Sequence, residues 1–472
     1  MSKIEKYNHI LTGFGSNIVG NILMFATTIY LTRTFDPHVY GEFRLIFSFI
    51  ALIVIILLLG RDNGIIYFSQ NEERNKDTII KEEVYFGFIV LLIGTFVLYL
   101  FGDFILANFL NKETRQEYFY LSLVMIPLWG FFNLLLASLR SKGLINYTFI
   151  LSNLVQRAIR VPFFVGLALV SVSYYSLVFG MILSQVVLIY LALKKLPFLL
   201  KVKDINLKNF FLRFSYAAQL GFNAIIVVLL TKIDVIMVGK YTENTQVAIY
   251  DTCVMLSFVV LLPFIALVKS SEPFMQALIY QKDVQEKYRK NLKLSIELSL
   301  GILLFFSLAS DDLLHIFGEA YVSGSNTLIV LSTSYMLLVM LGSPIEVLNM
   351  NGFTKVSSIV LVLSIFINIG LNVLLIPIYG IIGASVATGV SLVFSKLVGL
   401  YLAKKNLGVN FLHKTLDLKV YVLFMIFFLL SFFLHSDSWI FHILFSFLIL
   451  LFFFFSLVLI EKDYRKILLS KI

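Results

Sequence analysis

Apolar runs of about twenty residues recur along nearly the whole chain, and they restrict the fold more than any other feature. As a helix, such a run is long enough to cross a hydrocarbon core about 30 Å thick. The 472 residues are 59% hydrophobic and only 14% charged, and the mean hydropathy is +0.91. A water-soluble protein cannot cover its surface with this composition. The sequence therefore predicts an all-α polytopic membrane protein, since a β-barrel would show alternating segments about ten residues long.

The apolar runs define fourteen predicted transmembrane helices. Their boundaries are approximate, as they are in any assignment from hydropathy. The predicted spans are 9–32, 43–60, 84–102, 118–139, 146–170, 174–193, 214–238, 247–268, 294–309, 326–348, 356–376, 380–402, 419–435 and 439–460.

The distribution of Lys and Arg tests the helix count and the orientation together. With the N-terminus in the cytoplasm, 29 of the 38 basic residues fall in cytoplasmic segments and five in external ones. The other four, Arg157, Arg160, Lys232 and Lys396, lie inside predicted spans. Because cytoplasmic loops of membrane proteins are rich in Lys and Arg, this asymmetry predicts that both termini are cytoplasmic. It also explains the net charge of +10 without a nucleic-acid partner.

Short matches at offsets of 210 and 209 residues indicate an internal duplication. VYGEF at 39–43 corresponds to IYDTC at 249–253, and LRSKGLINYT at 139–148 corresponds to LNMNGFTKVS at 348–357. Both pairs occupy equivalent places in the order of spans, which is the signature of a repeat. Six spans return the chain to the same side, so the two repeats would run parallel, a common plan among transporters. The predicted domains are 1–205 (helices 1–6), 206–408 (helices 7–12) and 409–472 (helices 13 and 14).

Several segments, in their order and spacing, resemble the polysaccharide and O-antigen flippase family. That family belongs to the multidrug/oligosaccharidyl-lipid/polysaccharide exporter superfamily, with the lipid II flippases and the multidrug and toxic compound extrusion transporters. The resemblance covers the whole chain. It rests on the helix count and on LTRTFDPHVYGEF (31–43), LGRDNGIIYF (59–68), LRFSYAAQLGFNAII (212–226), KIDVIMVGKY (232–241) and LIPIYGIIGASVATGVS (375–391).

The resemblance implies two six-helix lobes around a central cavity that opens alternately to each side. It also implies a substrate class, oligosaccharides carried on a polyprenyl pyrophosphate. Such a chain would lie in the cytoplasmic membrane of a bacterium and would act beside polysaccharide polymerases and glycosyltransferases.

Two arginines interrupt the predicted fifth span. Asn153, Gln156, Arg157 and Arg160 recur at i, i+3, i+4 and i+7, which places them on one helix face. Arg157 would lie roughly 16 Å along this span, near the membrane midplane. A charge there costs about 2.5–3.5 kcal/mol on insertion scales, so the face must meet protein or water. Two interpretations are open: the arginines pair with carboxylates (Asp234, Glu297 or Glu346), or they line a cavity and bind an anion such as pyrophosphate.

Other polar residues in or near the spans are further candidates. Asn17 and Asn21 share a face of the first span, and Gln219 and Asn223 share a face of the seventh. Such pairs serve either interhelical hydrogen bonds or sugar hydroxyls. Lys232 is a candidate second cationic site, Asp234 a structural charge partner, and Arg33 a residue at the outer mouth. Arg61 and Asp62 form either a gate ion pair or, as favoured here, a solvated helix end.

The leading hypothesis is a flippase for a polyprenyl-pyrophosphate-linked O-antigen or capsular repeat unit, and not an enzyme. A drug or cation extruder of the same fold is the first alternative, but it would call for cavity carboxylates where the midplane charges are positive. A membrane glycosyltransferase or polymerase is the second, and it would need reactive carboxylates or a metal. Cys253 stands alone and the six histidines lack ligand spacing, so no cofactor is predicted.

Overall fold

The computed structural model describes residues 3–71, 76–110, 113–200, 207–268, 275–276, 280–408, 422–427 and 439–460. Within α1 and α11 it describes the backbone throughout and only some of the side chains. The chain forms two compact units, Met1–Ala248 and Ile249–Ile472. Each unit is described below by itself.

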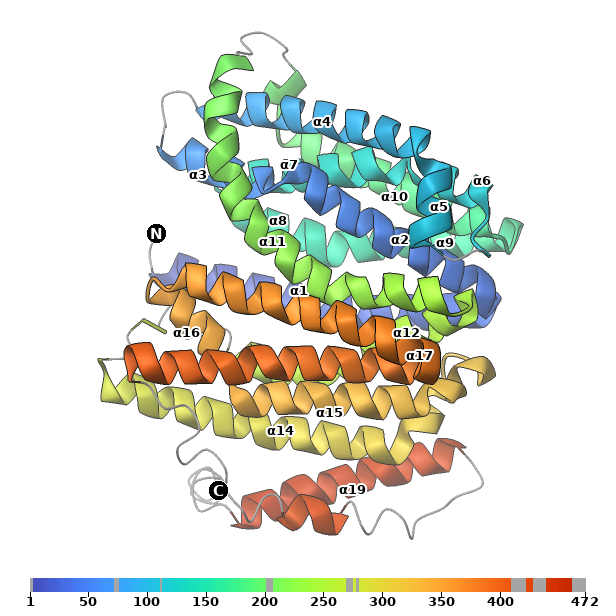
Figure 1. The fold of residues 1–472 in the computed structure, drawn as a ribbon, viewed down its shortest axis with the longest axis vertical. Coiled ribbons are helices and arrows are strands. Elements are labelled where there is room, and N and C mark those ends of the chain that lie inside the picture. Colours follow the sequence, from blue (N-terminus) through green and yellow to red (C-terminus); the bar gives the residue numbers. More distant parts are fainter. Residues whose placement is uncertain are drawn as a thin grey trace. The chain divides into compact units, whose positions relative to one another are not determined.

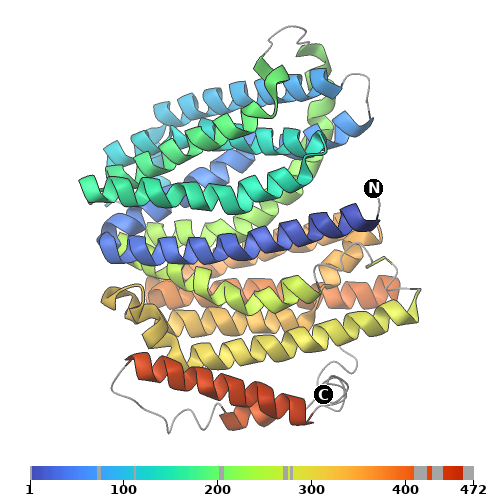
Figure 2. The ribbon, with the colours of Figure 1, turned by 180° about the vertical axis from the view of Figure 1, so that it is seen from behind.

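The described part of the first unit is built of helices (Figures 1 and 2). A six-residue π-helical segment, Ile150–Val155, joins α8 to α9, and α12 begins in this unit and continues into the second. The helices are α1 (Lys3–Thr34), α2 (Pro37–Leu58), α3 (Arg61–Asn71), α4 (Lys76–Leu100), α5 (Gly102–Phe109), α6 (Gln116–Ser122), α7 (Met125–Ser141), α8 (Ile145–Phe149), α9 (Gln156–Val170), α10 (Tyr174–Lys194), α11 (Leu207–Tyr241) and α12 (Asn244–Ser257).

Both ends of α2 are set by local sequence. The Asp36 side chain accepts a hydrogen bond from the His38 amide at 2.8 Å, and Pro37 opens the first turn, where its missing N–H costs nothing. At the other end Leu59 (φ 45°) and Gly60 (φ 76°) adopt left-handed backbone and break the helix before α3 begins. The predicted second span therefore ends at a sharp turn rather than by fraying.

The described part of the second unit is also helical. Figure 1 shows α14, α15 and α17 side by side, with α19 against α14. The long α17 carries a break at Gly380 (φ 56°), between the predicted spans 356–376 and 380–402. Its helices after α12 are α13 (Leu262–Leu267), α14 (Lys282–His315), α15 (Ser325–Leu341), α16 (Pro344–Met350), α17 (Thr354–Leu407) and α19 (Trp439–Ile460).

Several polar residues of the second unit contact one another. Asn372 donates to Asn368 at 3.1 Å, Asn368 donates to Ser391 at 3.4 Å, and all three are buried. The Lys396 ammonium pairs with the Glu346 carboxylate at 3.1 Å. Glu297 pairs with Lys293 at 3.9 Å. Two of the three carboxylates considered as partners for the arginines of the fifth span are thus engaged by lysines.

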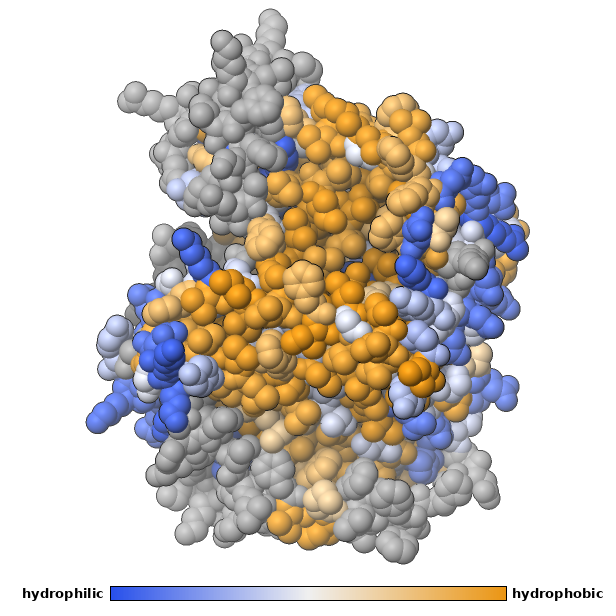
Figure 3. All heavy atoms as spheres, in the orientation of Figure 1, coloured by the Kyte–Doolittle hydropathy of each residue, from blue (hydrophilic) through white to orange (hydrophobic). Residues whose placement is uncertain are grey.

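The predicted fold class is confirmed. Ten helical segments of the described chain are long and apolar enough to cross a membrane, and no strand occurs in the described residues. Figure 3 shows apolar side chains over the visible middle of the helices and hydrophilic ones toward helix ends. One of the ten, Thr354–Leu407, contains two predicted spans. The predicted first and seventh spans fall within α1 and α11, and most of 419–435 lies outside the described residues.

The division into units does not test the predicted domain boundaries, which follow the repeats. It does show that α11, which the sequence predicts as the first helix of the second repeat, packs on α2 and α3 of the first unit. The boundaries near 205 and 408 stay predictions.

A close backbone approach makes Gly41 sensitive to substitution. A Cβ built on Gly41 would lie 1.8 Å from the carbonyl oxygen of Asn244. Gly41→Leu is expected to destabilise the protein by about 3 kcal/mol. The leucine side chain would overpack the contact between the backbones at Gly41 and Asn244. We expect a loss of about 3–6 °C in melting temperature in detergent. Gly166→Leu is the matched control, since a Cβ on Gly166 meets nothing within 4 Å; equal melting temperatures for the two variants would contradict the contact.

Candidate functional site

A pocket inside the first unit brings together the arginines of the predicted fifth span. Its volume is about 110 Å³, and one water needs roughly 10–15 Å³ by this measure, so several water molecules or a small anionic group would fit. The walls come from α1, α2, α9 and α10. The lining residues are Met24, Thr27, Thr28, Leu31, Tyr40, Phe43, Arg44, Phe47, Arg157, Arg160, Phe164 and Met181.

The Arg157 side chain, which extends from α9, is held in place by a hydrogen bond to α1. Its Nη1 donates to the side-chain oxygen of Asn21 at 2.7 Å. The two helices meet at Gly20, where a Cβ would lie 2.2 Å from the Asn153 carbonyl oxygen and 2.8 Å from Arg157 Nη1. The glycine therefore permits the close approach that places the guanidinium beside α1. Asn17 and Asn21, which were predicted to share a face of the first span, differ in their surroundings. Asn21 accepts the hydrogen bond from Arg157, whereas Asn17 is exposed.

Arg160 is oriented by a residue one turn earlier. With the Gln156 amide turned to satisfy both of its polar atoms, its oxygen accepts from Arg160 Nη2 at 2.8 Å and its nitrogen donates to the Ser152 carbonyl at 2.9 Å. Each guanidinium of the pair thus has a neutral amide at its side. Among the described residues, neither Arg157 nor Arg160 forms an ion pair with a carboxylate. The pocket therefore concentrates positive charge that an anion would neutralise.

The local helix geometry departs from the predicted one. The segment Ile150–Val155 is a π-helix, so the register changes between Asn153 and Gln156. Such turns are rare and often mark functional sites. Gln156, Arg157 and Arg160 still act together from α9, whereas Asn153 contributes its backbone at the contact with Gly20. Arg157 and Arg160 line the pocket, whereas Gln156 and Asn153 do not, and the substrate-binding role of the four residues stays a prediction.

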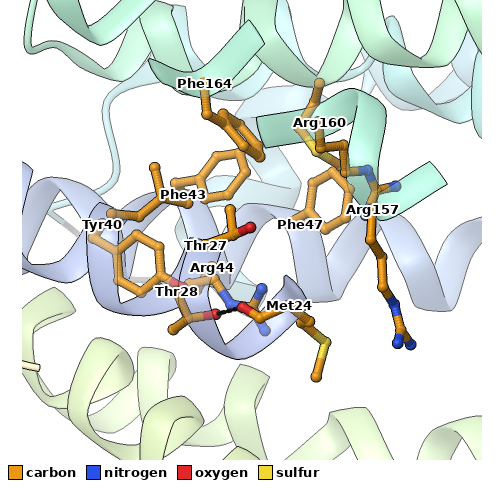
Figure 4. Close-up of a pocket in the computed structure, with 12 residues that line it drawn as sticks. Met24, Thr27, Thr28, Tyr40, Phe43, Arg44, Phe47, Arg157, Arg160 and Phe164 are labelled. Carbon is orange, nitrogen blue, oxygen red and sulfur yellow. Dashed lines mark hydrogen bonds between the residues drawn. The ribbon is translucent and has the colours of Figure 1, made fainter. Parts of the chain in front are cut away.

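Aromatic residues form the other side of the pocket. Phe43 stacks on Phe47 with ring centroids 5.4 Å apart, and Phe47 stacks on Trp129 at 4.8 Å. Figure 4 shows the rings of Phe43, Phe47 and Phe164 gathered at the pocket, with Arg160 beside Phe47. The sequence pattern did not identify these residues or Arg44 as part of a site. Their spacing on α2, with Tyr40, Phe43, Arg44 and Phe47 at helical intervals, was the available signal.

The remaining predicted site residues lie elsewhere. Arg33 is exposed in the last turn of α1, and on α11 Lys232 is half-buried and Asp234 buried. None of them lines the pocket. Gln219 and Asn223 are on α11, but their side chains are outside the description. The roles assigned to these residues stay predictions.

Arg61 is not the solvated helix end that was favoured. It is 2% exposed, and its Nη1 lies 3.7 Å from Glu83 Oε2 of α4. Its guanidinium also lies over the Phe86 ring, 4.7 Å from the centroid. Burial of an arginine requires such partners, and the break at Leu59–Gly60 is what turns Arg61 inward. Asp62 is half-buried in the next position of α3.

Comparisons with known proteins agree with this architecture. The chain is similar to the lipid II flippase MurJ in an inward closed conformation (TM-score 0.74, 16% identity, 96% of this chain and 100% of that one). It is also similar to an inward-facing multidrug resistance MATE family transporter of the MOP superfamily (TM-score 0.65, 14% identity, 83% and 95%). At these identities the likeness shows a shared fold.

Sequence comparison identifies the family. A curated relative, the probable low-salt glycan biosynthesis flippase Agl15 of Haloferax volcanii, is 24% identical over 247 residues. The chain spans about half the length of this relative in that match. The model of the polysaccharide biosynthesis protein family matches residues 9–279, more than half of the chain and all of the pocket. The resemblance noted in the sequence is thus confirmed: the chain belongs to the polysaccharide biosynthesis protein family.

Proposed function

We propose that the chain is a flippase that moves a polyprenyl-pyrophosphate-linked oligosaccharide across the cytoplasmic membrane by alternating access. The observation that carries the proposal is the pair Arg157–Arg160, held by neutral amides in a pocket between membrane-spanning helices. Evolutionary membership in a polysaccharide biosynthesis family and likeness to a lipid II flippase support it.

The pyrophosphate suits the pocket chemically. Guanidinium groups offer paired N–H donors that match phosphate oxygens, and such charge-assisted hydrogen bonds are among the stronger ones in proteins. Thr27 and Thr28 already donate their hydroxyls to backbone carbonyls of α1, and their oxygens keep acceptor capacity for a sugar hydroxyl. Apolar rings on the remaining wall are typical of small-molecule sites. The lipid chain would stay in the bilayer.

Transport by this route requires no covalent step, so the proposal includes no catalytic residue and no cofactor. In this proposal both termini are cytoplasmic and the membrane is a bacterial inner membrane. The partners are the glycosyltransferases that build the repeat unit and the polymerase that consumes it. The repeat unit would be an O-antigen or a capsular polysaccharide unit.

A cation extruder is the second candidate, because multidrug transporters share the fold. A cationic drug would need carboxylates, whereas the charged residues that line this pocket are Arg44, Arg157 and Arg160. Charge thus favours an anionic substrate over a cationic one.

Ligand-dependent stability tests the choice of substrate. We expect a polyprenyl pyrophosphate to raise the melting temperature of the purified protein more than the monophosphate, and a neutral polyprenol to leave it unchanged. At 100 times the dissociation constant the stabilisation is about 2.7 kcal/mol. The effect should disappear in Arg157→Ala/Arg160→Ala and persist in Arg140→Ala, an exposed arginine of α7. Stabilisation by a cationic dye in place of the pyrophosphate would favour the extruder.

A further inference from the structure

Four buried charges join three helices of the first unit at the end of α2 away from the pocket. Arg213 of α11 donates to Glu82 of α4, and its Nη1 lies 3.6 Å from Glu83 Oε1. Glu83 also faces Arg61 of α3 at 3.7 Å. All four residues are less than about a tenth exposed. We call Arg61, Glu82, Glu83 and Arg213 the latch cluster.

The latch cluster sits beside a second contact between α11 and the same region. A Cβ built on Gly221 would lie 2.3 Å from the Leu59 carbonyl carbon and 2.4 Å from the Gly60 amide nitrogen. The backbone of α11 therefore rests directly on the break between α2 and α3. Glycine at 221 permits this close approach, because a larger side chain would collide with the backbone of Leu59 and Gly60.

The length of α11 leaves room for this attachment. Its 35 residues extend about 52 Å at 1.5 Å per residue, whereas a span needs about 30 Å. The turns around Arg213 thus lie toward the end where the predicted cytoplasmic loops gather. These turns hold α11 on the first unit, although the predicted sequence repeats place α11 at the start of the second repeat.

The charged side chains of the latch cluster suit a contact that opens and closes more than they suit a permanent one. A permanent anchor could be apolar at equal or greater stability, because desolvation offsets most of the attraction within a buried ion pair. An apolar anchor would expose hydrocarbon to water each time it opened. Arginine and glutamate are well hydrated when separated, so a charged contact can alternate between a dry paired state and a wet separated one.

The pocket and the latch cluster lie at opposite ends of α2. Tyr40, Phe43, Arg44 and Phe47 line the pocket from the first turns, and Leu59 and Gly60 meet Gly221 just past the last turn. A displacement of α11 at the break would be transmitted along one rigid helix to four residues of the site.

On the basis of the proposed function, we propose that the latch cluster is a releasable lock. It holds the first half of α11 on α3 and α4 in the structure seen here, and it must separate once in each transport cycle. Arg213 and Glu82 form its moving contact, while Arg61 and Glu83 stay together on α3 and α4.

Hydrogen–deuterium exchange of the purified protein tests the lock without any substrate. In Glu82→Gln, amides of 207–221 are expected to exchange on the order of 100-fold faster than in the wild type, because one partner of a buried pair is lost. Amides of α14 report global stability and should keep their rates. Asp77→Asn is the matched control on α4, since Asp77 pairs with Lys142 at the surface; it should leave 207–221 unchanged. Unchanged exchange of 207–221 in Glu82→Gln would overturn the lock.

Cross-linking tests whether the contact must open during transport. Glu82→Cys/Arg213→Cys is made in a Cys253→Ala background and treated in membrane vesicles with a bifunctional methanethiosulfonate. We expect lipid-linked sugar transport to fall at least tenfold on cross-linking and to return with reductant. Undiminished transport by the cross-linked protein would show a static contact and overturn the proposal. If the wild type moves no lipid-linked sugar, the proposed function fails, and the exchange experiment still decides on the lock.

Discussion

Arg157→Ala/Arg160→Ala is expected to reduce the display of lipid-linked sugar on the outer face of the membrane by on the order of 100-fold or more. Each arginine offers charge-assisted hydrogen bonds worth about 1.5–3 kcal/mol, and about 1.4 kcal/mol corresponds to tenfold in binding. The variant should remain folded, because the alanines remove two charges that the pocket must otherwise hold without a carboxylate. Outer-face labelling of the sugar in cells that lack the native gene measures the effect.

Two further variants separate charge from geometry. Arg157→Lys/Arg160→Lys keeps both charges and loses the paired donors, so transport should fall between the wild type and the alanine variant. Arg140→Ala removes an exposed arginine of α7 and should transport normally. Normal sugar display by the double alanine variant, at equal protein level, would remove the two arginines from the site.

Gly20→Val is expected to reduce transport at least tenfold, through the contact between α1 and α9. The added side chain would meet the Asn153 carbonyl at 2.2 Å and Arg157 Nη1 at 2.8 Å, so α1 must move away from the start of α9. The hydrogen bond between Asn21 and Arg157 breaks, and the overpacking costs about 1–3 kcal/mol of stability. We expect transport to fall at least tenfold even where protein remains in the membrane.

The same helix provides the control for this prediction. A Cβ on Gly15, five positions earlier in α1, meets nothing within 4 Å. Gly15→Val carries the same change in helix propensity without the contact, and it should transport like the wild type. Equal losses in Gly15→Val and Gly20→Val would show that α1 matters for another reason than its approach to Arg157.

The sequence was sufficient for the fold class because the bilayer imposes a simple requirement. Every backbone polar group within hydrocarbon must be paired internally, so twenty apolar residues predict a helix whatever its neighbours. The same reasoning located Arg157 and Arg160, whose charge is costly wherever it faces lipid. The prediction that failed concerns an ion pair between helices. The sequence of α3 has no periodic pattern that would indicate that Arg61 is buried against Glu83 of α4.

The pocket walls were harder to predict for a related reason. Phe43 and Phe47 read as ordinary apolar residues of a span, and only their place in one pocket with Arg160 of α9 makes them part of a site. Likewise Glu82 and Arg213 lie in segments that read as basic and acidic loop flanks. They become a buried pair because α11 meets α4, and the two residues are 131 positions apart in the chain. Local patterns cannot encode a contact of that separation.

Flipping by the purified protein in liposomes tests the central claim most directly. A polyprenyl-pyrophosphate oligosaccharide with a fluorescent sugar is placed in both leaflets, and a membrane-impermeant quencher reports how fast the inner pool reaches the outside. We predict that the wild type exchanges the two pools and that Arg157→Ala/Arg160→Ala leaves the inner pool protected. Equal exchange by both proteins, or exchange of a cationic dye without that of the labelled lipid, would contradict the account.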